Sequence, residues 1–346
     1  MAPTRSQWMI PFAVQLIPGG CLLIGAVWLK ESPRWLFANN KREQAMKNLS
    51  WIRMLPEDHP YLLEEIEAIE KQVEYDRIHV GAGFWKPFLA LKEKKVAIRL
   101  LLGGGLFLWQ NGSGINAINY YSPTVFKSIG VTGTNTGFLT TGIFGVVKTV
   151  LTVIWLLWLI DHLGRTKLLM FGALGGSLCM WYIAVYIKIA NPTKNPTTQL
   201  SSGGISAMFF FYLWTAFYTP SWNGTPWVIN SEMYSQQTRS LGQAFAAANN
   251  WFWNFLVSRF TPQMFLAMNY GVYMFFACLM LLSIPYVFFL IPETKGIPLE
   301  KMDELFEIKP TFKAHPIMLQ RLEEVDHDAL AFNTEKTKID ERVESV

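Results

Sequence analysis

Apolar residues occur along this chain in long runs that are separated by shorter polar segments. A run of about 20 apolar residues is long enough for a helix to cross the hydrocarbon core of a bilayer. Seven runs of roughly this length are present, at residues 10–29, 98–126, 137–160, 168–189, 205–229, 242–264 and 270–291. The pattern therefore predicts an all-α integral membrane protein.

The composition and the charge distribution sharpen this prediction. Hydrophobic residues make up 51% of the chain, aromatic residues 15% and charged residues only 16%, which is more apolar than an ordinary soluble domain. Lys and Arg gather in residues 30–99, in residues 161–167 and after residue 291, whereas the other loops hold few. Because cytoplasmic loops are enriched in Lys and Arg, we assign these three segments to the cytoplasm and the amino terminus to the outside.

Two polar segments flank the longest group of spans. Residues 36–97 have the helical periodicity of a cytoplasmic linker, and its apolar positions include Leu49, Ile52, Leu62, Ile66 and Ile69. Residues 292–346 form a charged cytoplasmic tail that we expect to be largely disordered after residue 306.

The ends of the first and last spans resemble each other weakly. Residues 30–36 and 292–299 both present an acidic residue, then Ser or Thr, then a cation and a Pro. Such a repeat is expected when two halves of a transporter are related by internal symmetry. On this basis residues 1–35 are the final helix of an N-terminal half, and residues 98–291 are a complete six-helix C-terminal half.

Polar side chains interrupt the second apolar run between residues 109 and 126. At bilayer depth a polar side chain costs free energy unless it faces other protein or a watery cavity, and glycine lets the backbone break there. On a helical period Gln110, Ser113 and Asn116 or Ala117 share one face, which Tyr120 and Tyr121 continue a turn later. We interpret this face as the wall of a site for a polyhydroxylated ligand. The candidate ligands are Gln110, Asn111, Asn116, Tyr120 and Tyr121.

A single lysine, Lys148, lies in the middle of the span at residues 137–160. A lysine at the bilayer centre costs about 2.5 to 3.5 kcal/mol on insertion scales, so it needs an anion or a strongly polar cavity. Within the six spans the only acidic residue is Glu232, near the cytoplasmic end. We hypothesise that the anion is a substrate carboxylate; the alternatives are a wet cavity and an acidic residue in helices outside this sequence.

Several short motifs occur together in this chain. No motif is specific alone, but their combination in this order and spacing is. The chain resembles the fungal sugar porters of the major facilitator superfamily, and within them the quinate permeases. The motifs are Glu31-Ser-Pro-Arg34, Gln110-Asn-Gly-Ser-Gly-Ile-Asn116 with Tyr120-Tyr121, Asp161-His-Leu-Gly-Arg165, the run from Trp214 to Trp227, Pro226-Trp-Val-Ile-Asn-Ser-Glu232 with Arg239, and Pro292-Glu-Thr-Lys-Gly296.

The resemblance implies which residues contact the substrate. An amide donates and accepts hydrogen bonds at once, which suits hydroxyl groups, and an indole stacks on an aliphatic ring. Two positions depart from the commoner pattern: Asn111 replaces a second Gln, and Lys148 replaces an amide. A polyol acid such as quinate fits these departures better than a hexose. The implied contacts are Gln110, Asn116, Trp227, Asn250 and Trp251.

The resemblance further implies secondary-active transport in the plasma membrane, by alternating access around a midplane site. It also implies proton symport, but the family's proton acceptor lies in an early helix of the N-terminal half. The first five helices of that half are not in this sequence. We therefore expect a truncated form that needs the missing half for transport.

Charged residues at the cytoplasmic ends of the spans are a second candidate site. In the family such residues form ion pairs that hold the inner side shut and separate when the halves rock. The positive-inside rule explains the arginines without any gate, and Thr166 stands where a second Arg is usual, which we expect to weaken the network. The residues are Glu31, Arg34, Asp161, Arg165, Glu232 and Arg239.

Two rival functions remain open at this point. A nutrient sensor of the same fold would signal through its cytoplasmic parts, and a hexose transporter would use the same amides. An enzyme is not expected, because no nucleophile has a neighbouring base. We expect no cofactor, no metal site and no nucleic-acid partner; the expected partners are a small polyol acid or sugar, protons and the lipid membrane.

Overall fold

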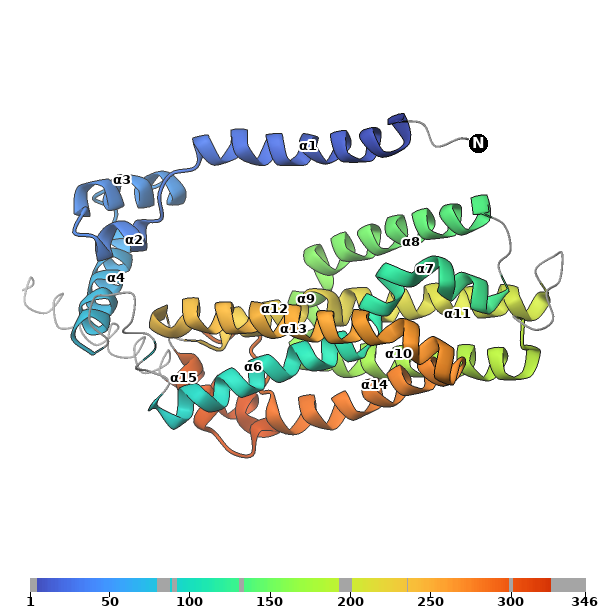
Figure 1. The fold of residues 1–346 in the computed structure, drawn as a ribbon. Coiled ribbons are helices and arrows are strands. Elements are labelled where there is room, and N and C mark those ends of the chain that lie inside the picture. Colours follow the sequence, from blue (N-terminus) through green and yellow to red (C-terminus); the bar gives the residue numbers. More distant parts are fainter. Residues whose placement is uncertain are drawn as a thin grey trace, which may run out of the picture. The chain divides into compact units, whose positions relative to one another are not determined.

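The computed structural model describes residues 5–79, 88, 92–130, 134–192, 201–234, 236–298 and 301–324, and every regular element among them is helical. The chain divides into two compact units, Met1–Lys86 and Pro87–Val346. Figure 1 shows the helices of both units, coloured along the sequence from blue at the N-terminus to red at the C-terminus.

The first unit holds one long apolar helix, α1 (Arg5–Trp28), and three shorter helices, α2 (Pro33–Ala38), α3 (Arg42–Arg53) and α4 (Pro60–His79). The shorter helices bury a common apolar cluster, whose members are Leu36, Phe37, Ala45, Leu49, Leu62, Ile66 and Ile69.

One apolar residue of this segment lies outside the cluster. Ile52, one residue before the end of α3, is 49% exposed, whereas the buried positions of α3 are Ala45 and Leu49. Ion pairs between α3 and α4, such as Arg53–Glu65, are exposed, so the apolar cluster contributes more to stability than they do. Residues 80–87 and 89–91 of the expected linker lie outside the described residues.

The second unit is a bundle of membrane-length helices, several of which are interrupted. In Figure 1 these helices run side by side, with α10 between α11 and α14 and with α13 against α6. The elements are α6 (Lys94–Gly112), α7 (Ile115–Ile129), α8 (Thr134–Ile154), η2 (Trp155–Leu159), α9 (Ile160–Leu163), α10 (Arg165–Ala190), α11 (Ser202–Tyr218), η3 (Thr219–Asn223), α12 (Thr225–Glu232), α13 (Gln236–Met268) and α14 (Gly271–Leu290).

Three continuous helices among the described residues are long and apolar enough to cross a membrane: Gly142–Leu163, Arg165–Ala190 and Gly271–Leu290. Two other predicted spans are broken into shorter pieces. The span at 98–126 consists of α6 and α7, and the span at 205–229 consists of α11, η3 and α12.

The break between α6 and α7 lies at Gly114, whose backbone has φ +85°. Only glycine adopts this conformation without strain, and a Cβ atom there would lie 2.8 Å from the Phe276 ring. A further non-helical residue, Tyr121, precedes Pro123 in α7. The expected break is therefore present, but the single helical face that we expected from Gln110 to Tyr121 is wrong, because the helical period restarts at Gly114.

The segment after α14 is more ordered than its composition suggested. α15 (Met302–Glu307), a 3₁₀ turn at Thr311–Lys313 and a helix at 314–324 follow one another. They bury a small apolar cluster that includes Leu305 and Met318. The expectation of disorder after residue 306 is thus wrong for residues up to 324, because five buried apolar side chains spaced along 297–318 form a core of their own.

The start of α6 binds α15 through charged groups. Arg99, which is 7% exposed, pairs with Asp303, and its guanidinium lies 5.3 Å from the centre of the Phe306 ring. Lys95 pairs with Glu307 one turn earlier on α6. Because Arg99 is buried, its pair resists solvent screening more than the exposed Lys95 pair does.

The break at Gly114 yields a stability prediction. Gly114→Ala places a Cβ at positive φ and against Phe276, so we expect the free energy of unfolding to fall by about 1–3 kcal/mol. Gly112→Ala is the matched control, since its Cβ would make only ordinary contact with Leu279 at 3.4 Å in a helical backbone. Thermal unfolding in detergent measures both, and equal stability of the two variants would contradict the assignment of strain to Gly114.

Candidate functional site

The break between α6 and α7 brings two buried amides to the end of α6. Gln110 is 6% exposed and Asn111 is 1% exposed. Ser113 closes the last turn of α6, since its N–H donates to the Trp109 carbonyl at 3.1 Å and its hydroxyl donates to the Gln110 carbonyl at 2.6 Å. Both amides are thus held at a helix end inside the bundle, where backbone groups also need partners.

Gln110 reaches the second broken helix. Its Nε2 donates to the carbonyl of Trp222 at 2.8 Å and to the carbonyl of Asn223 at 3.0 Å. Both carbonyls belong to η3, the π-helical segment that precedes α12. Gln110 therefore joins the two interrupted helices of this unit.

Three asparagines form a chain of amides across three helices. Asn116 on α7 donates to Oδ1 of Asn111, and Nδ2 of Asn111 donates to Oδ1 of Asn250 on α13 at 3.2 Å and to the Phe107 carbonyl at 2.8 Å. Asn111 is thereby enclosed by protein. Among the described residues, the ends of this amide chain are free for other partners: the Asn116 carbonyl oxygen as an acceptor and the Asn250 NH₂ group as a donor.

The four aromatic residues predicted for the site differ in their exposure and in their contacts. Tyr121 donates its hydroxyl to the Ser258 carbonyl on α13 at 3.1 Å. Trp227 is half-buried on α12 and packs edge-on against Phe107 with ring centroids 4.6 Å apart. Tyr120 and Trp251 are 57% and 66% exposed, and no contact of the described residues joins them to the amide chain.

Lys148 lies almost midway between Thr134 and Leu163, the ends of the helical stretch that contains it. Its side chain is half-buried, and no carboxylate among the described residues forms an ion pair with it. One turn later, Thr152 donates to the Lys148 carbonyl at 2.8 Å and receives a bond from Asn223 at 3.5 Å. The lysine is therefore on the part of α8 that contacts η3.

A second cation within the helices went unnoticed in the sequence. Arg259 lies on α13 next to Ser258, nine residues before the helix ends, and is exposed. The sequence could have revealed it, because an arginine stands in an apolar run between Val257 and Phe260. Its exposure and its place nearer the helix end distinguish it from Lys148.

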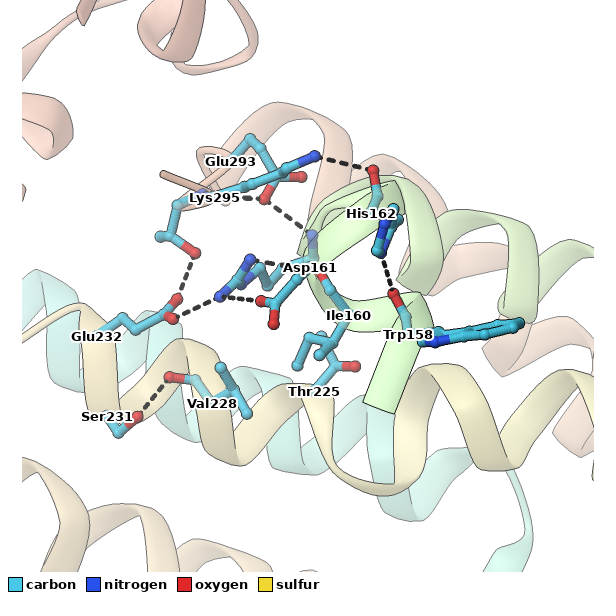
Figure 2. A network of polar contacts seen from close by, with 12 residues as sticks. Trp158, Ile160, Asp161, His162, Thr225, Val228, Ser231, Glu232, Glu293 and Lys295 are labelled. Carbon is cyan, nitrogen blue, oxygen red and sulfur yellow. Dashed lines mark hydrogen bonds and ion pairs between the residues drawn. The ribbon is translucent and has the colours of Figure 1, made fainter. Parts of the chain in front are cut away.

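The helix ends that the sequence assigned to the cytoplasmic side carry a separate polar network (Figure 2). Arg165, at the start of α10, pairs with Glu232 at the end of α12 at 3.0 Å, with only 11% and 18% of the two side chains exposed. Its contact with Asp161 is longer, 3.5 Å, and that carboxylate is 72% exposed. The Arg165–Glu232 pair therefore contributes more than the Arg165–Asp161 pair.

Glu293, which the sequence placed in a motif but not in the site, is central to this network. Its carboxylate accepts the backbone N–H groups of Arg165 at 2.8 Å and Thr166 at 2.9 Å, as well as the Thr166 hydroxyl at 2.7 Å. A carboxylate at this position satisfies the free N–H groups of the first turn of α10. Thr294 next to it donates to Glu232 at 2.6 Å.

Thr166 takes part in this network, since its hydroxyl and its N–H both bind Glu293. The weakening expected from the missing Arg at this position stays a prediction. The contact could not be foreseen from the sequence, because Glu293 is far away in sequence and reaches Thr166 only in the folded protein.

The remaining predicted gate residues are placed as follows. Arg239 donates to the Tyr234 carbonyl at 3.3 Å, near the start of α13. In the first unit, Glu31 accepts the N–H of Ser32 at 3.2 Å and Arg34 lies in the first turn of α2. In the described part of the chain, no group of His, Cys, Asp and Glu is arranged to hold a metal ion.

Known proteins that resemble this chain are described as transporters. A quinate permease from Neurospora terricola is 69% identical over 324 residues, which cover 93% of this chain and 60% of that relative. A protein from Neurospora crassa described as the MFS-type transporter qa-x is 66% identical over 324 residues, with the same coverage of 93% and 60%. The chain thus spans about 60% of the length of these curated relatives.

Solved structures of a sugar transporter and a family model also match the chain. The proton:xylose symporter XylE bound to 6-bromo-6-deoxy-D-glucose matches with a TM-score of 0.68 and 28% identity, over 86% of this chain and 58% of that chain. An inward-open XylE structure matches with a TM-score of 0.56 and 26% identity, over 87% and 57%. The model for the family described as Sugar (and other) transporter matches residues 1–306. The chain belongs to this sugar transporter family and has the fold of the major facilitator superfamily.

Proposed function

We propose that the protein acts in secondary-active transport of quinate or a closely related polyol acid across the plasma membrane, by alternating access with proton symport. The observation that carries the substrate class is Lys148, a cation midway along the helical stretch Thr134–Leu163 that no carboxylate of the described residues neutralises. The family supports membrane transport rather than enzymatic chemistry.

The polyol part of the substrate is recognised by the ends of the amide chain. The Asn116 oxygen accepts a bond from one hydroxyl, and the Asn250 NH₂ group donates to another, because their other groups are engaged with Asn111. Hydroxyl groups both donate and accept, so one polyol satisfies both ends. Trp227 offers an indole for stacking on the aliphatic ring.

The carboxylate is recognised by Lys148. An ammonium at bilayer depth gains from an anion that enters a site of low dielectric, because the attraction between them is screened less there than in water. Quinate has one carboxylate on a cyclohexane ring that carries hydroxyl groups, so one molecule engages the amides and the lysine together.

Alternating access uses the cytoplasmic network as its inner gate. Arg165, Glu232 and Glu293 connect the ends of α10, α12 and α14 through pairs that are partly shielded from water. Such pairs stabilise one arrangement and separate when water enters between the helices. Asp161 and Arg239 are the outer members of this proposed gate in the second unit, and Glu31 and Arg34 are gate candidates within the first unit.

A second candidate is a transporter of uncharged sugars, which the likeness to XylE bound to a glucose derivative favours. A nutrient sensor of the same fold is a third candidate, for which the folded segment at 301–324 is the observation. Uptake of labelled quinate and glucose by a full-length relative separates the first two, and absence of any uptake by it together with retained quinate binding would favour the sensor.

Lys148→Met is the decisive substitution for the substrate class. We expect the purified protein to bind quinate at least about 10-fold more tightly than its uncharged methyl ester, and we expect Lys148→Met to abolish this preference, since the pair is worth about 1.4 kcal/mol or more in a shielded site. Titration calorimetry in detergent measures both ligands.

Arg259→Gln is the matched control, because it removes another cation within an apolar helical run, from an exposed position. We expect it to leave the preference for quinate over the ester within about twofold, as weak, screened interactions do. A Lys148→Met protein that still prefers the acid would exclude the lysine as the carboxylate partner.

The gate proposal predicts that neutralising Glu232 lowers stability more than neutralising Asp161, although both carboxylates pair with Arg165. Glu232→Gln leaves the shielded Arg165 without its main partner, so we expect the free energy of unfolding to fall by about 2–4 kcal/mol. Asp161→Asn should change it by no more than about 0.5 kcal/mol, since that carboxylate is exposed. Thermal unfolding compares the two, and equal losses would argue against Arg165–Glu232 as the dominant pair.

A further inference from the structure

The break between η3 and α12 leaves two backbone carbonyls without their regular helical donors. In an α-helix the carbonyl of residue 222 would accept from the N–H of residue 226, but Pro226 has no N–H. The carbonyl of Asn223 would accept from Trp227, whose N–H donates instead to Gly224 at 3.0 Å. Carbonyls left unpaired inside a membrane bundle are costly.

Gln110 supplies both missing bonds. Its amide nitrogen has two hydrogens, and it donates to the Trp222 carbonyl at 2.8 Å and to the Asn223 carbonyl at 3.0 Å. The side chain is 6% exposed, so water does not compete effectively for these carbonyls. The two donors of Gln110 are therefore engaged by the protein and not available to a ligand.

We propose that Gln110 is a positioning residue as well as an amide of the substrate site: its NH₂ group replaces the donor that Pro226 lacks, holds the break between η3 and α12, and thereby places Trp227. Its Oε1 is buried and has no partner among the described residues, so the acceptor side of the amide stays free. Trp227 is the residue that follows Pro226, and its ring packs against Phe107. Phe107 lies about one turn before Gln110 on α6. One face of α6 thus fixes both the broken backbone and the indole.

This positioning role depends on the proposed function only in treating Trp227 as a substrate contact. The bonds from Gln110 to the two carbonyls form without any ligand. Stability measured in the absence of ligand therefore tests the role of Gln110 even if the substrate is not quinate.

The test is a double-substitution cycle with Gln110→Leu and Pro226→Ala, measured as the Tm of the purified full chain in detergent. Leucine keeps the size and removes the donors, so we expect Gln110→Leu alone to lower Tm by roughly 4–8 °C. Alanine at 226 restores an N–H for the Trp222 carbonyl, so the same leucine should then lower Tm by less than about half as much. An equal loss in both backgrounds would overturn the proposal.

Two further variants keep the test decisive if Pro226→Ala is itself unstable. Pro285→Ala is the matched control, since this proline also lies within a membrane helix, α14, and is not part of the break between η3 and α12. It should not reduce the effect of Gln110→Leu, and rescue by it would count against the proposal. Gln110→Glu preserves the shape and replaces the NH₂ with a second oxygen. It should lower Tm at least as much as leucine does, and a wild-type Tm would overturn the proposal.

Quinate affinity of the same proteins supplies the readout for Trp227. We expect Gln110→Leu to weaken binding about 10-fold or more and Pro226→Ala to recover part of that loss, as a residue acting through the backbone break should. Stability rescue without any recovery of affinity would overturn the placing of Trp227. If the stability cycle holds but no variant, including the wild type, binds quinate, the proposed function fails and the bond between Gln110 and the break stands.

Discussion

Every polar group that a broken helix leaves unpaired in this bundle has to find a partner within the protein, and most of the proposed site follows from this requirement. The backbone stops being helical at Gly114 and again before Pro226. Gln110 binds the carbonyls at the second break, and Asn111 joins the two sides of the first through Asn116. The side chains that bridge the breaks determine which neighbouring amide groups remain free for a ligand.

The same requirement organises the network around Arg165 and Glu293. The first turn of α10 presents unpaired N–H groups, and Glu293 satisfies two of them from a segment more than 120 residues later. The weak repeat between the two span ends has a structural counterpart here. Glu31 accepts the N–H of Ser32 at 3.2 Å, and Glu293 accepts the N–H of Thr294 at 3.1 Å, so each acid fixes the chain just after a membrane helix.

The family, the helical fold and the break near Gly114 could be predicted because each depends on local sequence: long apolar runs, short motifs and glycines beside amides. The partners of Gln110 could not, since they required knowing that Pro226 removes a donor 116 positions away and that the two breaks face each other. The contacts of Thr166 and the folding of the segment at 301–324 could not be foreseen for the same reason. A threonine hydroxyl and a few spaced apolar residues gain their meaning only from what lies opposite them in space.

The place of Lys148 midway along the helical stretch Thr134–Leu163 has an electrical consequence as well. A charge within the membrane experiences the transmembrane potential, which is worth about 2.3 kcal/mol per elementary charge for each 100 mV across the full thickness. Once a substrate carboxylate is bound, as proposed, the ammonium belongs to a neutral pair on which the potential acts little, whereas the empty site keeps its positive charge. Voltage would therefore bias the return of the empty protein differently from the movement of the loaded one.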